Sequence, residues 1–320
     1  MRNLHLEAAI WNLFTSAEFF EAAAHECDET MKWFGTLAIS RNVVDFGRNN
    51  QIFDKFKQRA RDFRRGAELA KRGDYSLIWE ISGCINGDVR GMMEQPLHSW
   101  MTEAEYREFE SVRIIRLITY ASQIESALNN AIIGAESFLD SEEDCEDEGF
   151  PGEDIVGWYN EYINIFKEPS CVKIPDPLPE YVIEKSSACK TGDEVPWTGV
   201  WYPDVGLEHC SLTFAIKGLR MQPAYRVTKT AEELEEEGDL FPTPETLAVK
   251  TIWHPLILSG RRAETDKELR AKAGEPCPRA GVWEALDAGA VRRRTYEAGE
   301  TMGNLGSAYG ITVWLWVGDR

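Results

Sequence analysis

The chain has 320 residues and a formal net charge of −19, with 43% hydrophobic and 28% charged residues. This composition allows a sizeable core, and the absence of any run of 18 apolar residues excludes a membrane-spanning helix. The acidic balance repels phosphate backbones and therefore disfavours nucleic-acid binding, whereas it favours encounter with a basic protein partner. The N-terminus lacks the pattern of a secretory signal, so we expect a cytoplasmic protein.

Cysteine and histidine usage predicts neither disulfides nor a metal centre. The seven Cys are an odd number and form no C-x-x-C pair, which favours reduced, packed thiols. The five His are scattered and form no H-x-x-x-H pair. We therefore predict no metal site. No G-x-x-x-x-G-K-[ST] pattern occurs and no G-x-G-x-x-G pattern follows a strand, so we also predict no cofactor.

Residues 1–168 are predicted to form an all-helical bundle domain. Apolar residues recur at helical spacing from Leu6 to Phe34. Further helices are expected over residues 49–72, 75–93 and 155–166.

The clearest helix begins at Thr102, where T-E-A-E forms a capping box with Glu105. Its apolar side continues to Leu139, which predicts a rod of roughly 55 Å. The run DSEEDCEDE at 140–148 has seven acidic residues in nine and is predicted to be a solvated loop.

A proline-rich linker is predicted over 169–185, because proline at this density cannot continue a helix. Residues 186–320 follow as a β-rich domain, with strand-like segments such as 212–216, 248–253 and 311–317. The predicted fold class is therefore α+β, a helical bundle followed by a β-rich domain.

The β-rich domain contains an internal duplication, with repeat 1 at about 189–258 and repeat 2 at about 271–320. The pattern G-x3-P-x2-G-V-W occurs twice, 82 residues apart, and a G-x-x-M pattern follows each copy. Matched positions at fixed spacing predict two small barrel- or sandwich-like units. The matched residues are Gly192, Pro196, Gly199, Trp201, Gly218 and Met221 in repeat 1, and Gly274, Pro278, Gly281, Trp283, Gly299 and Met302 in repeat 2.

These matched residues are predicted to be scaffold. Glycines permit turns and close backbone approach, prolines fix φ ahead of a strand, and each Trp fills a small core. None can act as an acid, base or nucleophile. A ligand-stacking role for Trp201 and Trp283 is the alternative.

Repeat 1 also carries a hydrophilic insert at 228–246 that repeat 2 lacks. Its core, EELEEEGD, has six acidic residues in eight and is expected to project from the edge of the β unit; the alternative is a disordered loop without a partner. The insert is the first candidate for contact with a partner, through Glu232, Glu233, Glu235, Glu236, Glu237 and Asp239.

The block CKTGDEVPWTGVWYPD, its echo AKAGEPCPRAGVWEALD and the following G-x-x-M resemble immunity proteins of bacterial polymorphic-toxin systems. These are the large class encoded beside Rhs-type or type VI secreted toxins. The resemblance covers mainly residues 189–320, and repeat 2 departs from it where Gly303 and Asn304 replace the Pro223 of repeat 1. It implies a cytoplasmic antitoxin, not an enzyme, that binds one cognate toxin domain with a basic surface and occludes its active site or target-binding surface.

Two other readings remain open. The first is a hydrolase or transferase with a site between the two halves, which includes an enzyme that reverses a toxin's modification. Its candidates are His209 or His254 beside Asp204 or Glu208. The second is a small-ligand-binding module that uses the aromatic strands of the repeats.

Overall fold

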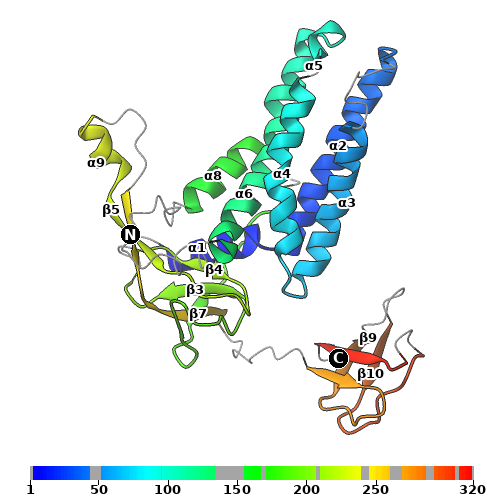
Figure 1. The fold of residues 1–320 in the computed structure, drawn as a ribbon, viewed down its shortest axis with the longest axis vertical. Helices are drawn as coiled ribbons and strands as arrows, with labels where there is room; N and C mark the ends of the chain where they lie inside the picture. Colours follow the sequence, from blue (N-terminus) through cyan, green and yellow to red (C-terminus); the bar gives the residue numbers. More distant parts are fainter. Residues whose placement is uncertain are drawn as a thin grey trace. The chain divides into compact units, whose positions relative to one another are not determined.

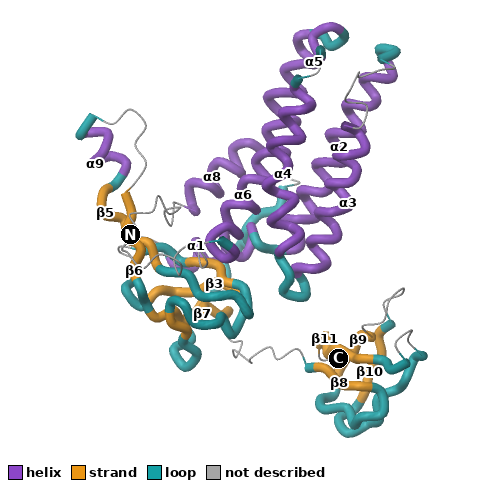
Figure 2. Tube along the Cα trace, viewed as in Figure 1, coloured by secondary structure: helices purple, strands orange, loops and turns teal. Residues whose placement is uncertain are grey.

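Helices form the N-terminal part of the chain and small antiparallel sheets follow, which confirms the predicted α+β class (Figures 1 and 2). The computed structural model describes residues 3–43, 52–94, 96–133, 155–166, 171–206, 210–238, 245–259, 269–285, 292–306 and 310–318. The side chains of residues 52, 53, 130, 231 and 232 are not part of this description.

The described helices pack their apolar faces into one core. None of the described helices combines the length and apolarity needed to cross a membrane. The elements are α1 (Leu4–Phe14), α2 (Ala17–Ser40), α3 (Ile52–Ala70), α4 (Ser76–Met93), η2 (Leu97–Ser99), α5 (Glu103–Glu108), η3 (Phe109–Ile114), α6 (Ile115–Ile132) and α8 (Ile155–Phe166).

The apolar stretch from Leu6 to Phe34, expected to be one helix, is two helices, α1 and α2. The break lies at Thr15 and Ser16, and the Ser16 hydroxyl accepts a hydrogen bond from the Phe19 amide at 3.1 Å. Both helices bury their apolar residues in the same core, so the helical spacing continues through the break and conceals it in the sequence.

The capping box at Thr102 is confirmed, with both reciprocal hydrogen bonds to Glu105 present. The helix that it starts runs through α5, a π-helical turn (η3) and α6 without interruption as far as Ile132. Its predicted end near Leu139 and the acidic run 140–148 lie outside the described residues.

Repeat 1 forms an antiparallel sheet in the order β1-β7-β3-β4, with β2 also paired to β7. Part of the predicted linker belongs to this sheet, because β1 pairs with β7. The same strand also contacts α1, since the Tyr181 amide donates to His5 Nδ1 at 3.0 Å. The strands are β1 (Tyr181–Ile183), β2 (Cys189–Lys190), β3 (Gly199–Pro203), β4 (Thr213–Ala215) and β7 (Ile252–Leu258).

Repeat 2 reproduces this sheet. Its order is β10-β9-β11-β8, formed by β8 (Arg270–Lys272), β9 (Gly281–Ala285), β10 (Arg293–Tyr296) and β11 (Val313–Gly318), which matches β4-β3-β7-β2 of repeat 1. The turns match as well. The Gly192 amide donates to the Met221 carbonyl at 2.8 Å, and the Gly274 amide donates to the Met302 carbonyl at 2.8 Å. The duplication seen in the sequence is therefore a duplication of structure.

The motif tryptophans are core residues. Trp201 packs with Trp253 and Cys189, while Trp283 packs with Trp314 and Tyr296, and both motif rings are fully buried. A buried ring offers no face on which a ligand could stack. Trp201 and Trp283 therefore occupy core positions, and neither ring is accessible for the alternative role in ligand stacking.

The two repeats differ in what covers their outer faces. In repeat 1, Val200, Phe214 and Leu256 belong to the same core as the helices. The chain accordingly divides into compact units at Met1–Arg262 and Ala263–Arg320, not within the predicted linker 169–185. Each repeat has a small core of its own, and repeat 1 in addition packs its outer face into the core of the helices.

Alanine at Gly281 is expected to cost more stability than alanine at Gly199. Both glycines have positive φ, at +144° and +156°, where a Cβ is strained. A Cβ at Gly199 would overlap the end of the Trp197 ring, which is half-buried and can move, whereas a Cβ at Gly281 would overlap the Gly318 carbonyl. We expect Gly281→Ala to cost about 2 kcal/mol more than Gly199→Ala in chemical denaturation of the full chain. Equal losses of unfolding free energy in the two variants would show that the Gly318 backbone moves aside as easily as the Trp197 indole.

Candidate functional site

The insert of repeat 1 folds as an arm, which we define as residues 224–249. Strands β5 (Ala224–Lys229) and β6 (Glu245–Val249) pair antiparallel, and the short helix α9 (Ala231–Glu236) follows β5. Figure 1 shows this ribbon standing out from the sheet of repeat 1 and carrying α9. The alternative of a disordered loop does not apply to the described part of the insert.

Local hydrogen bonds determine the conformation of α9. Thr230 and Glu233 form a capping box, and Leu234 is buried. The Lys229 ammonium lies 2.8 Å from the Glu237 carboxylate and 4.0 Å from that of Glu245. Its hydrogen bond to Glu237 raises the pKa of Lys229 above its ordinary value.

The predicted contact residues therefore divide into two groups. Glu233 and Glu237 have structural partners within the arm, the Thr230 amide and Lys229. Glu235 and Glu236 are exposed, and their carboxylates have no ion pair or hydrogen bond to the described residues. The side chain of Glu232 and the whole of Asp239 lie outside the description.

The proposed enzyme residues are brought together only in part. His254 is buried on β7, and its Nε2 lies 3.6 Å from Asp204 Oδ1. In a catalytic pair the carboxylate holds one imidazole nitrogen while the other faces the substrate. Here the other nitrogen, Nδ1, is buried without a hydrogen bond to the described residues, so it is not presented to a substrate. Glu208 and His209 lie outside the description.

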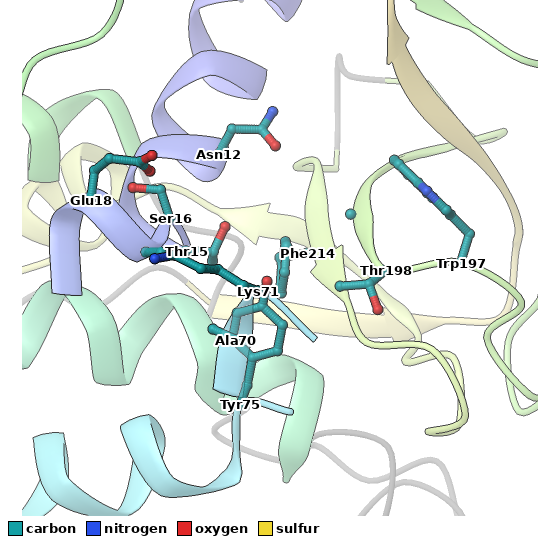
Figure 3. Close-up of a pocket in the computed structure, with 12 residues that line it drawn as sticks. Asn12, Thr15, Ser16, Glu18, Ala70, Lys71, Tyr75, Trp197, Thr198 and Phe214 are labelled. Atoms are coloured by element: carbon teal, nitrogen blue, oxygen red, sulfur yellow. The ribbon is translucent and has the colours of Figure 1, made fainter. Parts of the chain in front are cut away.

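A pocket of about 330 Å³ lies where the junction of α1 and α2 meets the end of α3 and the start of β3 (Figure 3). Most of its polar groups are already bonded. Thr15 donates to the Trp11 carbonyl at 2.8 Å, and Lys71 pairs with Glu21 and Glu68. The lining residues are Asn12, Thr15, Ser16, Ala17, Glu18, Ala70, Lys71, Tyr75, Trp197, Thr198, Gly199 and Phe214.

The Tyr75 hydroxyl also has no hydrogen bond to the described residues, and it points into the pocket in Figure 3. Burial raises the pKa of Tyr75 to about 12, so the phenol stays protonated near neutral pH and can donate a hydrogen bond but cannot act as a base. Sequence analysis did not select Tyr75, because an isolated tyrosine after a helix stop gives no signal of its own.

No group of three or more His, Cys, Asp or Glu side chains suited to a metal ion occurs among the residues that the structure describes. No protein-family model, no curated protein and no solved structure matches this chain. The function must therefore be argued from the arm and the repeats themselves.

Proposed function

We propose that this protein is an immunity protein, which binds a cognate secreted antibacterial toxin domain in a stoichiometric complex and occludes its active site or target-binding surface. The observation that carries the proposal is the arm, an acidic insertion whose described residues form paired strands and a short helix, and which the sequence of repeat 2 lacks.

An insertion that repeat 2 lacks is not required for the four-stranded unit, so its sequence is free to serve recognition. Glu235 and Glu236 are exposed and unpaired among the described residues, and no internal cation has to be displaced before they meet a partner. Together with the net charge of −19, they favour a partner with a basic surface. Complementary charges of this kind raise the association rate and select against wrong partners.

The test is co-expression with the toxin encoded beside it, followed by gel filtration and measurement of toxicity. The proposal predicts a complex with a fixed stoichiometry and survival of the cells. Persistent toxicity without a complex would refute it.

The arm itself is tested by the double variant Glu235→Lys and Glu236→Lys. We expect a Kd at least about tenfold higher, or ~1.4 kcal/mol, mainly through slower association that becomes less sensitive to salt. The melting temperature should not change, because neither carboxylate has a structural partner among the described residues.

A charge-matched control is Glu80→Lys with Glu161→Lys, which changes two exposed carboxylates on α4 and α8 by the same amount. The control should leave affinity close to that of the parent. Equal weakening by both double variants would show that only net charge matters, and unchanged affinity in the arm variant would remove the arm from the interface.

A further inference from the structure

The two repeats can be compared strand by strand, because their hydrogen bonds correspond. The indole of Trp253 donates to the Gln222 carbonyl at 3.0 Å, and the indole of Trp314 donates to the Gly303 carbonyl at 2.8 Å. Gln222 and Gly303 therefore occupy the same position. Likewise, β4 of repeat 1 corresponds to β10 of repeat 2, with Phe214 at the position of Thr295.

In repeat 1, the outer edge of β4 is closed. The Gln222 amide donates to the Phe214 carbonyl at 3.2 Å and also contacts the Thr213 hydroxyl. Helix α6 packs against β4, and Phe214 is buried in the core that the helices share. No further strand can pair with this edge while these groups occupy it.

In repeat 2, no described residue of the unit pairs with the same edge. Gly303 has no side chain with which to cap the Thr295 carbonyl. The Ala285 amide donates to the Arg292 carbonyl at 2.9 Å, so these two residues form a hydrogen-bonded pair between β9 and β10. Because hydrogen-bonded and non-hydrogen-bonded pairs alternate along an antiparallel ladder, the next residues of β10 that bond to β9 are Arg294 and Tyr296. The amide and carbonyl groups of Arg293 and Thr295 therefore point away from β9, where no described residue bonds them.

The side chains along this edge are basic. Residues 292–294 are three consecutive exposed arginines, at positions where repeat 1 has Ser211, Leu212 and Thr213. Arg293 pairs with Glu284 at 3.0 Å on one face of the sheet. Arg292 and Arg294 lie on the opposite face, because side chains alternate along a strand, and they have no ion pair with the described residues.

Open strand edges accept an added strand, and main-chain hydrogen bonds then provide affinity while side chains provide selectivity. We propose that β10 binds an extended acidic segment of another protein by strand addition. Pairing of β10 with β10 of a second copy would place arginines opposite arginines, which is destabilising. A segment with alternating carboxylates would instead place them beside Arg292 and Arg294. This proposal does not depend on the partner being a toxin.

The first experiment uses the full chain and a fluorescein-labelled, capped hexapeptide of alternating Glu and Thr. We expect saturable binding by fluorescence anisotropy, weakened by salt, and slower hydrogen exchange of the Arg293 and Thr295 amides in the complex. The same peptide with Lys in place of Glu should bind at least tenfold more weakly. Equal binding of the two peptides, or binding without added protection of these amides, would overturn the proposal.

The second experiment transfers the cap of repeat 1 into repeat 2. In Gly303→Gln, the new amide can donate to the Thr295 carbonyl, as Gln222 donates to Phe214. Among the described residues, a Cβ there meets only the Tyr296 hydroxyl at 3.1 Å and the mobile end of Arg294 at 3.2 Å. We expect Gly303→Gln to weaken peptide binding at least tenfold, whereas Gly303→Ala, which has a Cβ but no amide, should bind like the parent.

A second variant leaves Gly303 unchanged, so that the proposal can still be tested if Gly303→Gln disturbs the fold. Arg292→Glu with Arg294→Glu should abolish binding of the Glu peptide and create binding of the Lys peptide. Retained binding of the Glu peptide by this variant would refute the role of the arginines.

Discussion

Replacing Trp283 by alanine is expected to unfold the unit Ala263–Arg320 while Met1–Arg262 stays folded. The ring is fully buried in the core of repeat 2, beside Trp314 and Tyr296. Truncating a buried Trp costs about 3–5 kcal/mol, and a single small core rarely supplies more than about 3–5 kcal/mol in total. The loss is therefore as large as the stability of the unit.

Hydrogen exchange read by mass spectrometry separates the two units. In the Trp283→Ala chain, peptides from residues 269–285 and 310–318 should lose protection, and those from the helices should keep it. Trp316→Ala is the matched control, because that ring is only half-buried and its loss should leave the unit folded. Simultaneous loss of protection in both units would show that they fold as one cooperative body.

Asp88→Ala is expected to destabilise the helical part by about 2–3 kcal/mol. Asp88 is buried between α3 and α4, where its carboxylate lies 2.7 Å from Arg59 Nε and 3.6 Å from Lys55 Nζ. Removing the carboxylate leaves a partly buried guanidinium without its partner, and an uncompensated charge of this kind is costly. Lys55 is largely exposed and contributes little to the loss.

The control for Asp88 lies at the C-terminal end of the same helix. Arg90 and Glu94 form an ion pair at 3.4 Å with both side chains largely exposed, so Glu94→Ala should cost at most ~0.5 kcal/mol. Asp88→Asn should fall between the two alanine variants, because its amide oxygen can still accept from Arg59. Urea unfolding followed by circular dichroism at 222 nm gives all three values, and equal midpoints for Asp88→Ala and Glu94→Ala would contradict the assignment.

Local signals in the sequence predicted most of the secondary structure. The capping box at Thr102 and the helix end expected at residue 72, which Gly73 follows with a φ of +86°, act within one turn of the chain and depend on few distant contacts. The repeat was equally readable, because glycines with positive φ and a buried Trp are required wherever this small sheet is built. The break at Ser16 was not predicted, because the helical spacing of apolar residues continues across the cap.

The candidate surfaces were predictable only in part. The acidity of the insert was plain in the sequence. The pairing of β5 with β6, the hydrogen bond of Glu233 and the ion pair of Glu237 were not. The sequence does contain a signal for the open edge of β10. When the two repeats are aligned, RRRT at 292–295 stands where repeat 1 has SLTF at 211–214. That difference acquires meaning only when the strand is seen to lie at the edge of a sheet.

The sequence by itself determined the α+β class, the duplication and the acidic charge, and it predicted the scaffold role of the motif glycines and tryptophans. These follow from short-range geometry and from composition, which are properties of the chain alone. Only the tertiary structure decided that the outer face of the repeat 1 sheet packs into the core of the helices and that repeat 2 forms a separate unit. Which face of a sheet is covered depends on contacts between residues far apart in the sequence, such as Tyr75 against Phe214, and no local pattern encodes them.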